Sequence, residues 1–236
     1  MIKFPKKSVS HNRLKKECDF CDHHNHSLWD ELLCHIPYAG FSLACAFAFL
    51  SLLNFIAVIS VAPQNMFDGY HVLFHSFHYL HIIVAVTGAM VSFFRFSRNM
   101  VLGFLVAVLS PTLFCVMSDI MLPTIAGNLL GVPMHMHICF FCPQDALNLV
   151  AFMFIGVICG AALLQHEESL KTFALRSHFL HIFVSSLASL FYTVANGFTE
   201  WHEAMGLLYL FLFIAVVVPC TLSDVVVPYY CACNSK

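Results

Sequence analysis

Charged residues are scarce in this 236-residue chain. Asp, Glu, Lys and Arg together make up 10% of the sequence, whereas 60% of the residues are hydrophobic. A soluble protein carries about 25% charged residues, because charged side chains cover much of its surface. The shortage excludes an ordinary soluble domain, and no nucleic-acid partner is expected.

Lys and Arg are absent from three segments that separate apolar runs, at about 63–69, 124–145 and 196–203. All 11 basic residues fall elsewhere: Lys3, Lys6, Lys7, Arg13, Lys15, Lys16, Arg95, Arg98, Lys171, Arg176 and Lys236. Basic loops of membrane proteins stay in the cytoplasm. With six membrane spans this segregation is complete, which predicts that both termini are cytoplasmic.

Several enzyme motifs are also missing. The chain has no H-E-x-x-H and no G-x-S-x-G, so an intramembrane hydrolase is disfavoured. It lacks the H-x-x-H-H box of membrane desaturases, and the histidines of the apolar runs at 70–94 and 172–195 do not show the spacing of about four helical turns that is typical of paired haem ligands. A non-enzyme is therefore favoured, with a membrane-embedded metal- or haem-dependent oxidoreductase as the alternative.

What the chain does contain is a series of long apolar runs. A helix of about 20 residues crosses a hydrocarbon core roughly 30 Å thick. Six such runs lie at about 37–62, 70–94, 100–122, 146–165, 172–195 and 204–228. The first begins behind a polar arm, too far from Met1 for a cleaved signal peptide. We predict an all-α, multi-pass integral membrane protein with six helices in the lipid bilayer.

Two short motifs occur twice. His78-x-x-His81 has a near copy at His178-x-x-His181, 100 residues later. One apolar run downstream of each pair is a C-x-x-S-D-x-x-x-P string. The first string holds Cys115, Ser118, Asp119 and Pro123, and the second holds Cys220, Ser223, Asp224 and Pro228. The doubling predicts two related halves.

Each half contains three spans, so the second half must enter the membrane from the opposite side. This predicts an inverted repeat of the kind found in many secondary transporters. The expected parts are a cytoplasmic Cys/His-containing arm (1–34), a first three-helix repeat (35–131), an outer His/Cys loop (132–145), a second three-helix repeat (146–230) and a cytoplasmic tail (231–236).

The doubled motifs carry the candidate metal ligands. Residues three apart share one face of a helix, and a carboxylate within hydrocarbon costs about 2.5–3.5 kcal/mol unless it is paired. A divalent cation would supply the missing positive charge. We predict two sites, each of two histidines and one aspartate: His78, His81 and Asp119 in the outer half of the membrane, and His178, His181 and Asp224 in the inner half.

Accessory ligands are expected around these sites. They are His71, His75, Cys115, Cys220, His135, His137, Cys18, Cys21, His23 and His26. Two alternatives stay open: Cys139 and Cys142 either form a disulfide or join the outer histidines, and the arm is either a metal-binding segment or a solvated tail with reduced thiols.

Imidazole and carboxylate together suit zinc, which we favour, and also iron, manganese, nickel or cobalt. A lone membrane histidine usually serves as an interhelical hydrogen-bonding group, but a doubled pair with a doubled aspartate favours ligation. The sequence thus predicts a transporter of a divalent transition-metal cation, with protons as the candidate coupling ion.

Overall fold

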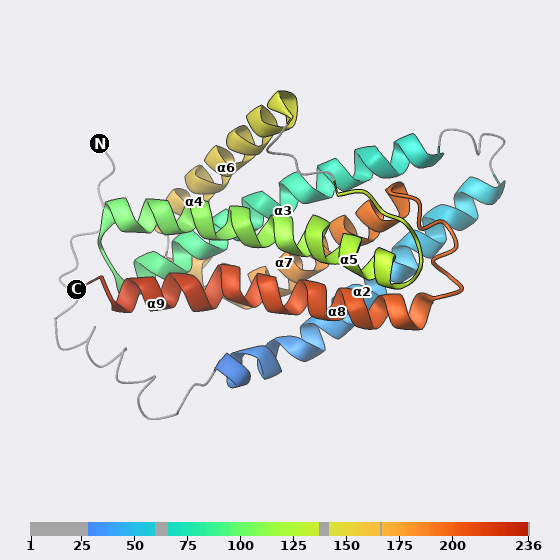
Figure 1. Cartoon of the computed structure of the whole chain (residues 1–236). Helices are drawn as coiled ribbons and strands as arrows, with labels where there is room; N and C mark the ends of the chain where they lie inside the picture. Colours follow the sequence, from blue (N-terminus) through green and yellow to red (C-terminus); the bar gives the residue numbers. More distant parts are fainter. Residues whose placement is uncertain (1–27, 60–65, 137–141, 166, 236) are drawn as a thin grey trace.

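The computed structural model describes residues 28–59, 66–136, 142–165 and 167–235, and every regular element within them is helical (Figure 1). The elements are α2 (Leu28–Ile59), α3 (Met66–Phe96), α4 (Met100–Val116), η2 (Met117–Met121), α5 (Leu122–Leu129), α6 (Pro143–Leu163), α7 (Glu167–Ala195), α8 (Met205–Thr221), η4 (Leu222–Val226) and α9 (Val227–Cys233). The prediction of an all-α protein is confirmed.

Some of these elements run on from one another. α4, η2 and α5 form one rod over Met100–Leu129, and α8, η4 and α9 form another over Met205–Cys233, so the described residues contain six helices. Five of them are long and apolar enough to cross a membrane. In the sixth, α7, the described apolar part is the shorter Phe179–Ala195. Five long apolar helices indicate a multi-pass membrane protein.

The helices pass back and forth along one direction (Figure 1). The turn at 97–99 and the end of α9 lie at one end of the bundle, where Ser97 Oγ is 2.7 Å from Ser235 Oγ. The segments 130–136 and 196–204 lie at the other end. α3 and α7 consequently run in opposite directions, which matters for the depth at which their histidines meet.

α3 and α7 form the centre of the bundle. In its most apolar 18-residue stretch 72% of α3 is buried, against 28% for α2 and 17% for α6. α3 and α7 pack on each other, α6 packs on α3, and α2 packs on α7. His78, His81 and His181 therefore point inward, as do Ser185 and Ser189, while α2 and α6 expose apolar side chains such as Phe55 and Phe154.

Two glycines let α6 approach α3 closely. A Cβ at Gly156 would lie 2.9 Å from the Val86 Cβ and 3.0 Å from the Ile83 carbonyl oxygen. A Cβ at Gly160 would lie 2.9 Å from the Met90 Sδ. Small residues at such contacts are common in membrane bundles, where close van der Waals packing holds helices together.

Both C-x-x-S-D-x-x-x-P strings adopt a π-helical turn, at η2 and η4. In that register a backbone N–H bonds to the carbonyl five residues earlier, as the Leu122 N–H does to Met117 and the Val227 N–H does to Leu222. The next residue in each case is a proline, which has no N–H to donate. The carbonyls of Ser118 and Ser223 therefore have no backbone N–H five residues later to bond to.

Serine side chains from other helices supply donors to these two carbonyls. Ser189 Oγ of α7 donates to the Ser118 carbonyl at 3.0 Å, and Ser110 Oγ of α4 donates to the Ser223 carbonyl at 3.4 Å. A carbonyl buried in a bundle needs such a partner, because hydrocarbon offers none. The breaks in the two rods are thus stabilised by contacts between different helices.

Candidate metal centre

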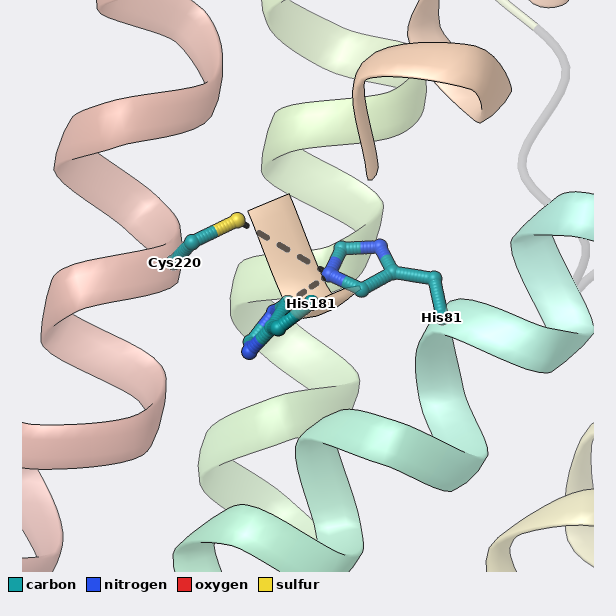
Figure 2. A group of neighbouring side chains, drawn as sticks. All are labelled: His81, His181 and Cys220. Carbon is teal, nitrogen blue, oxygen red and sulfur yellow. Dashed lines mark hydrogen bonds between the residues drawn. The ribbon is translucent and has the colours of Figure 1, made fainter. Parts of the chain in front are cut away.

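The central contact joins the two H-x-x-H helices. His81 Nε2 of α3 lies 2.6 Å from His181 Nε2 of α7, and both side chains are almost fully buried. The Sγ of Cys220, from α8, points to the same place (Figure 2). These three donor atoms lie within 4.8 Å of one another. Two imidazole nitrogens and a sulfur from three helices therefore converge inside the bundle.

A second thiol borders this group. Cys115 Sγ of α4 lies 3.6 Å from His81 Nε2, and Cys220 Sγ lies 3.8 Å from the same nitrogen. Both thiols are free and buried. The centre therefore brings together the cysteine of each C-x-x-S-D-x-x-x-P string and the second histidine of each H-x-x-H pair.

Asp119 holds the first-half histidines in position. Its Oδ2 accepts hydrogen bonds from His78 Nδ1 at 2.8 Å and from His81 Nδ1 at 2.7 Å. Its Oδ1 accepts from Ser118 Oγ at 2.8 Å and from Ser185 Oγ at 3.0 Å. The carboxylate thus has four donors. With its Nδ1 donating to Asp119, His81 turns Nε2 toward His181.

Asp224 positions His181 in the second half of the chain, but it has fewer hydrogen-bond partners than Asp119. Its Oδ2 accepts from His181 Nδ1. Within the described part of the chain, its Oδ1 and the neighbouring Ser223 Oγ are buried without a hydrogen-bond partner. A Cβ at Gly88 would lie 3.0 Å from Asp224 Oδ2 and 3.2 Å from its Cγ. The glycine therefore allows this carboxylate to pack directly against α3.

One sequence difference contributes to this asymmetry. Ser185 donates to Asp119 from a position four residues after His181. The matching position after His81 is Ala85, which has no hydroxyl to offer Asp224. The two halves thus share the carboxylate–imidazole bond but differ in how much else surrounds the carboxylate.

The arrangement suits a bound transition metal. Metal-ligating histidines usually donate their other ring N–H to a carboxylate, which fixes the tautomer and makes the ligating nitrogen more basic. Asp119 and Asp224 occupy that position behind His81 and His181. Two nitrogens and two sulfurs form a donor set that zinc accepts in tetrahedral geometry. The buried group of His81, His181 and Cys220 has the composition of a metal site.

The structure differs from the sequence-based expectation in two respects. His81 and His181 meet in one cluster, whereas two clusters on opposite sides of the midplane were expected. Both residues lie near the middle of their helices, and helices that run in opposite directions place their midpoints at the same depth. The aspartates, expected to face the metal directly, instead bond to imidazole Nδ1 atoms.

The other predicted residues are spread more widely. His78 is buried beside Asp119, His75 is half-buried at the edge of α3, and His71 and His135 are exposed. The side chain of His178 and the residues His137, Cys139, Cys18, Cys21, His23 and His26 lie outside the described residues. Cys142 is a free thiol.

Ser185 is the site residue absent from the predicted ligand set. Besides donating to Asp119, it lies 3.4 Å from Ser118 Oγ and accepts a hydrogen bond from Cys220 Sγ at 3.4 Å. It therefore links the two strings across the centre. The available signal was its spacing, because a residue four positions after His181 shares that histidine's helical face.

Comparison with known proteins gives no further guide to this site. No protein-family model, curated protein or solved structure matches the chain.

Proposed function

We propose that this protein is a membrane transporter of a divalent transition-metal cation, with zinc favoured, and that the ion binds between the two halves of the chain. One observation carries the proposal: His81 Nε2, His181 Nε2 and Cys220 Sγ converge in the interior of the bundle. Buried ionisable groups in membrane helices are expensive and mark ion pathways.

The donor atoms need only a small adjustment to hold zinc. With Zn–N bonds of about 2.0–2.1 Å, two nitrogens of a tetrahedral site lie about 3.3 Å apart. The two Nε2 atoms are 2.6 Å apart, so they would separate by about 0.7 Å on binding. Cys115, 3.6 Å from His81 Nε2, is the natural fourth ligand. Small rotations of the two imidazole rings that keep their Nδ1 hydrogen bonds to the carboxylates would provide this movement.

The short contact between the imidazoles also bears on the coupling ion. Two ring nitrogens 2.6 Å apart require a hydrogen between them, since two lone pairs would repel. A metal ion would have to occupy the same place. Metal and proton therefore exclude each other at the centre, which supports protons as the coupling ion.

The arrangement of the helices favours transport over permanent metal storage. If the two halves are related, α2 corresponds to α6 and α3 corresponds to α7. The packing of α6 on α3 then has its counterpart in the packing of α2 on α7, and both contacts are present. Both halves also carry a π-helical break beside the centre. Inverted repeats with interrupted helices at mid-depth are typical of secondary transporters. We infer that rocking of the halves exposes the centre to each side in turn.

Zinc uptake by proteoliposomes tests the proposal. Purified protein reconstituted around a zinc-sensitive dye should take up zinc, and the rate should fall to that of empty vesicles in a His81→Ala, His181→Ala double variant. His202→Ala, which alters an exposed histidine outside the centre, should leave uptake unchanged. Stoichiometric zinc binding without uptake would show a resident metal site instead.

We also propose that both termini are cytoplasmic, because the basic residues are segregated on one side. Cys142 would then lie at the outer end and Cys233 at the inner end. A membrane-impermeant maleimide added to intact cells should label a variant that retains Cys142 alone and spare one that retains Cys233 alone. Permeabilised cells provide the control, since both variants should then react. The opposite pattern would reverse the orientation.

A further inference from the structure

Adjacent residues of the η4 turn carry three oxygen atoms that have few hydrogen-bond donors. Asp224 Oδ1 and Ser223 Oγ are buried and have no hydrogen-bond partner within the described residues. The Ser223 carbonyl has no backbone N–H five residues later to bond to, because Pro228 stands there, and Ser110 Oγ reaches it at 3.4 Å. Buried polar atoms nearly always have partners, so this group of oxygens points to a bound ligand.

The equivalent oxygens of the first half are well bonded. Asp119 Oδ1 accepts from Ser118 Oγ at 2.8 Å and from Ser185 Oγ at 3.0 Å. The Ser118 carbonyl accepts from Ser189 Oγ at 3.0 Å. Both Ser–Asp pairs lie in the same kind of π-helical turn, so the difference comes from the surrounding helices rather than from the local backbone. The first half also shows that the two side chains of such a turn can place their oxygens 2.8 Å apart.

Positive charge is also scarce around the Asp224 carboxylate. Its Oδ2 bonds to His181 Nδ1, but the imidazole pair of His81 and His181 shares a single extra hydrogen, and two carboxylates bond to that pair. The basic side chains that the structure describes are exposed at the end of α3. The nearer one along this helix, Arg95, is about 10 Å beyond Gly88, the residue against which Asp224 packs. The charge of this carboxylate is therefore poorly balanced, which is costly in hydrocarbon.

A cation satisfies these oxygens better than water does. Water would donate hydrogens to them but would leave the charge of the carboxylate unbalanced. Oxygen ligands suit hard cations, whereas transition metals favour the nitrogen and sulfur donors of the metal centre. Ca²⁺ usually gathers several carboxylates and Mg²⁺ keeps several waters, so one carboxylate in a buried turn fits a monovalent ion best. In many secondary transporters the carbonyls of interrupted helices coordinate Na⁺, and η4 interrupts its rod in a similar way.

We propose that Asp224 Oδ1, Ser223 Oγ and the Ser223 carbonyl bind a sodium ion beside the metal centre, with Ser110 Oγ as a further oxygen ligand. The inference goes beyond the proposed function, because it adds an ion that the nitrogen and sulfur donors of the centre do not hold. The two sites share one carboxylate: Oδ2 of Asp224 orients His181, and Oδ1 is left for sodium. Sodium would also link η4 to α4 through Ser110, so it should stabilise the folded protein.

Thermal unfolding of the purified full-length protein, free of zinc and sodium, tests this site. Sodium chloride should raise Tm, whereas choline chloride at the same concentration should not, because choline is too large to fit among packed helices. At 100 times its Kd a ligand raises the ratio of folded to unfolded protein about 100-fold, which corresponds to a rise in Tm of about 5–10 °C in a chain of this size.

Two variants locate the effect. Asp224→Asn removes the charge with little change in shape and should abolish the response to sodium. Ser223→Ala, a milder change, should raise the sodium concentration for half of the Tm shift at least about 10-fold. Ser186→Ala is the matched control, because its buried hydroxyl bonds to the Ile182 carbonyl of its own helix, and it should respond like wild type. Equal effects of sodium and choline on wild type, or an unchanged response in either site variant, would overturn the sodium site.

Addition of Co²⁺ to the same proteins separates this inference from the proposed function. Co²⁺ bound by thiolates shows a sulfur-to-metal charge-transfer band. Ser223→Ala should keep this band while its response to sodium weakens, which also shows that the fold is intact. Absence of the band from wild type would overturn the thiolate-containing centre and leave the sodium site standing.

Discussion

Serine in place of Cys220 should lower zinc affinity by more than about 100-fold, beyond the 10–100-fold that loss of an outer-shell partner of a metal ligand typically costs. Among the described residues, Cys220 is the cysteine whose thiol groups with the ligand nitrogens of His81 and His181, all within 4.8 Å of one another. Serine has nearly the same shape, but its hydroxyl does not ionise to give the soft, charged ligand that a thiolate provides. The variant should therefore fold and insert normally while the centre loses its strongest donor.

Competition with a chelator of known zinc affinity measures this change, and the cobalt charge-transfer band should weaken in parallel. Cys159→Ser is the matched control, because Cys159 is an exposed thiol on α6 away from the centre. Unchanged zinc affinity in Cys220→Ser would mean that the thiol serves only as a hydrogen-bonding group to Ser185, and the metal centre would have to be abandoned.

The helical framework was largely predictable, because the length of an apolar run reports directly on the thickness of the bilayer. The positions of the helix ends were less predictable. The first apolar run was placed at about 37–62, whereas α2 extends over Leu28–Ile59 and continues through Pro37. Hydropathy marks the part of a helix that lies in hydrocarbon, and a helix can extend beyond that part into water or the lipid headgroups.

The doubled motifs also directed attention to His81 and His181, since doubled polar motifs in membrane helices have few explanations other than function, and their role as ligands stays a prediction. Their geometry did not follow. Whether Asp119 faces a metal or an imidazole Nδ1 depends on the rotation of α4 relative to α3, which spacing within one helix does not specify. The hydroxyl of Ser189, which supports the Ser118 carbonyl, comes from 71 residues away and is visible only in three dimensions.

The asymmetry between the two carboxylates leads to the second large effect. Asp119→Ala should destabilise the metal-free protein more than Asp224→Ala, although both should weaken zinc binding by a similar factor of about 10–100. Each buried donor left without an acceptor costs roughly 1–3 kcal/mol. Removal of Asp119 strands the two imidazole donors, His78 Nδ1 and His81 Nδ1, whereas the Ser118 hydroxyl keeps the Cys115 carbonyl and the Ser185 hydroxyl keeps Ser118 Oγ as acceptors. The loss should therefore be about 2–6 kcal/mol.

Removal of Asp224 strands one donor, His181 Nδ1, and it also removes a buried oxygen that has no partner within the described residues. The loss of stability should therefore stay near about 1–3 kcal/mol. Thermal unfolding of the detergent-solubilised, metal-free variants compares the two, with Ser223→Ala as the control because its buried hydroxyl bonds to nothing in that part of the chain. Equal shifts in Tm for Asp119→Ala and Asp224→Ala would contradict the four-donor network. A shift confined to Asp119→Ala, together with a matched fall in zinc affinity, would separate the structural role of this carboxylate from the orienting role that both carboxylates share.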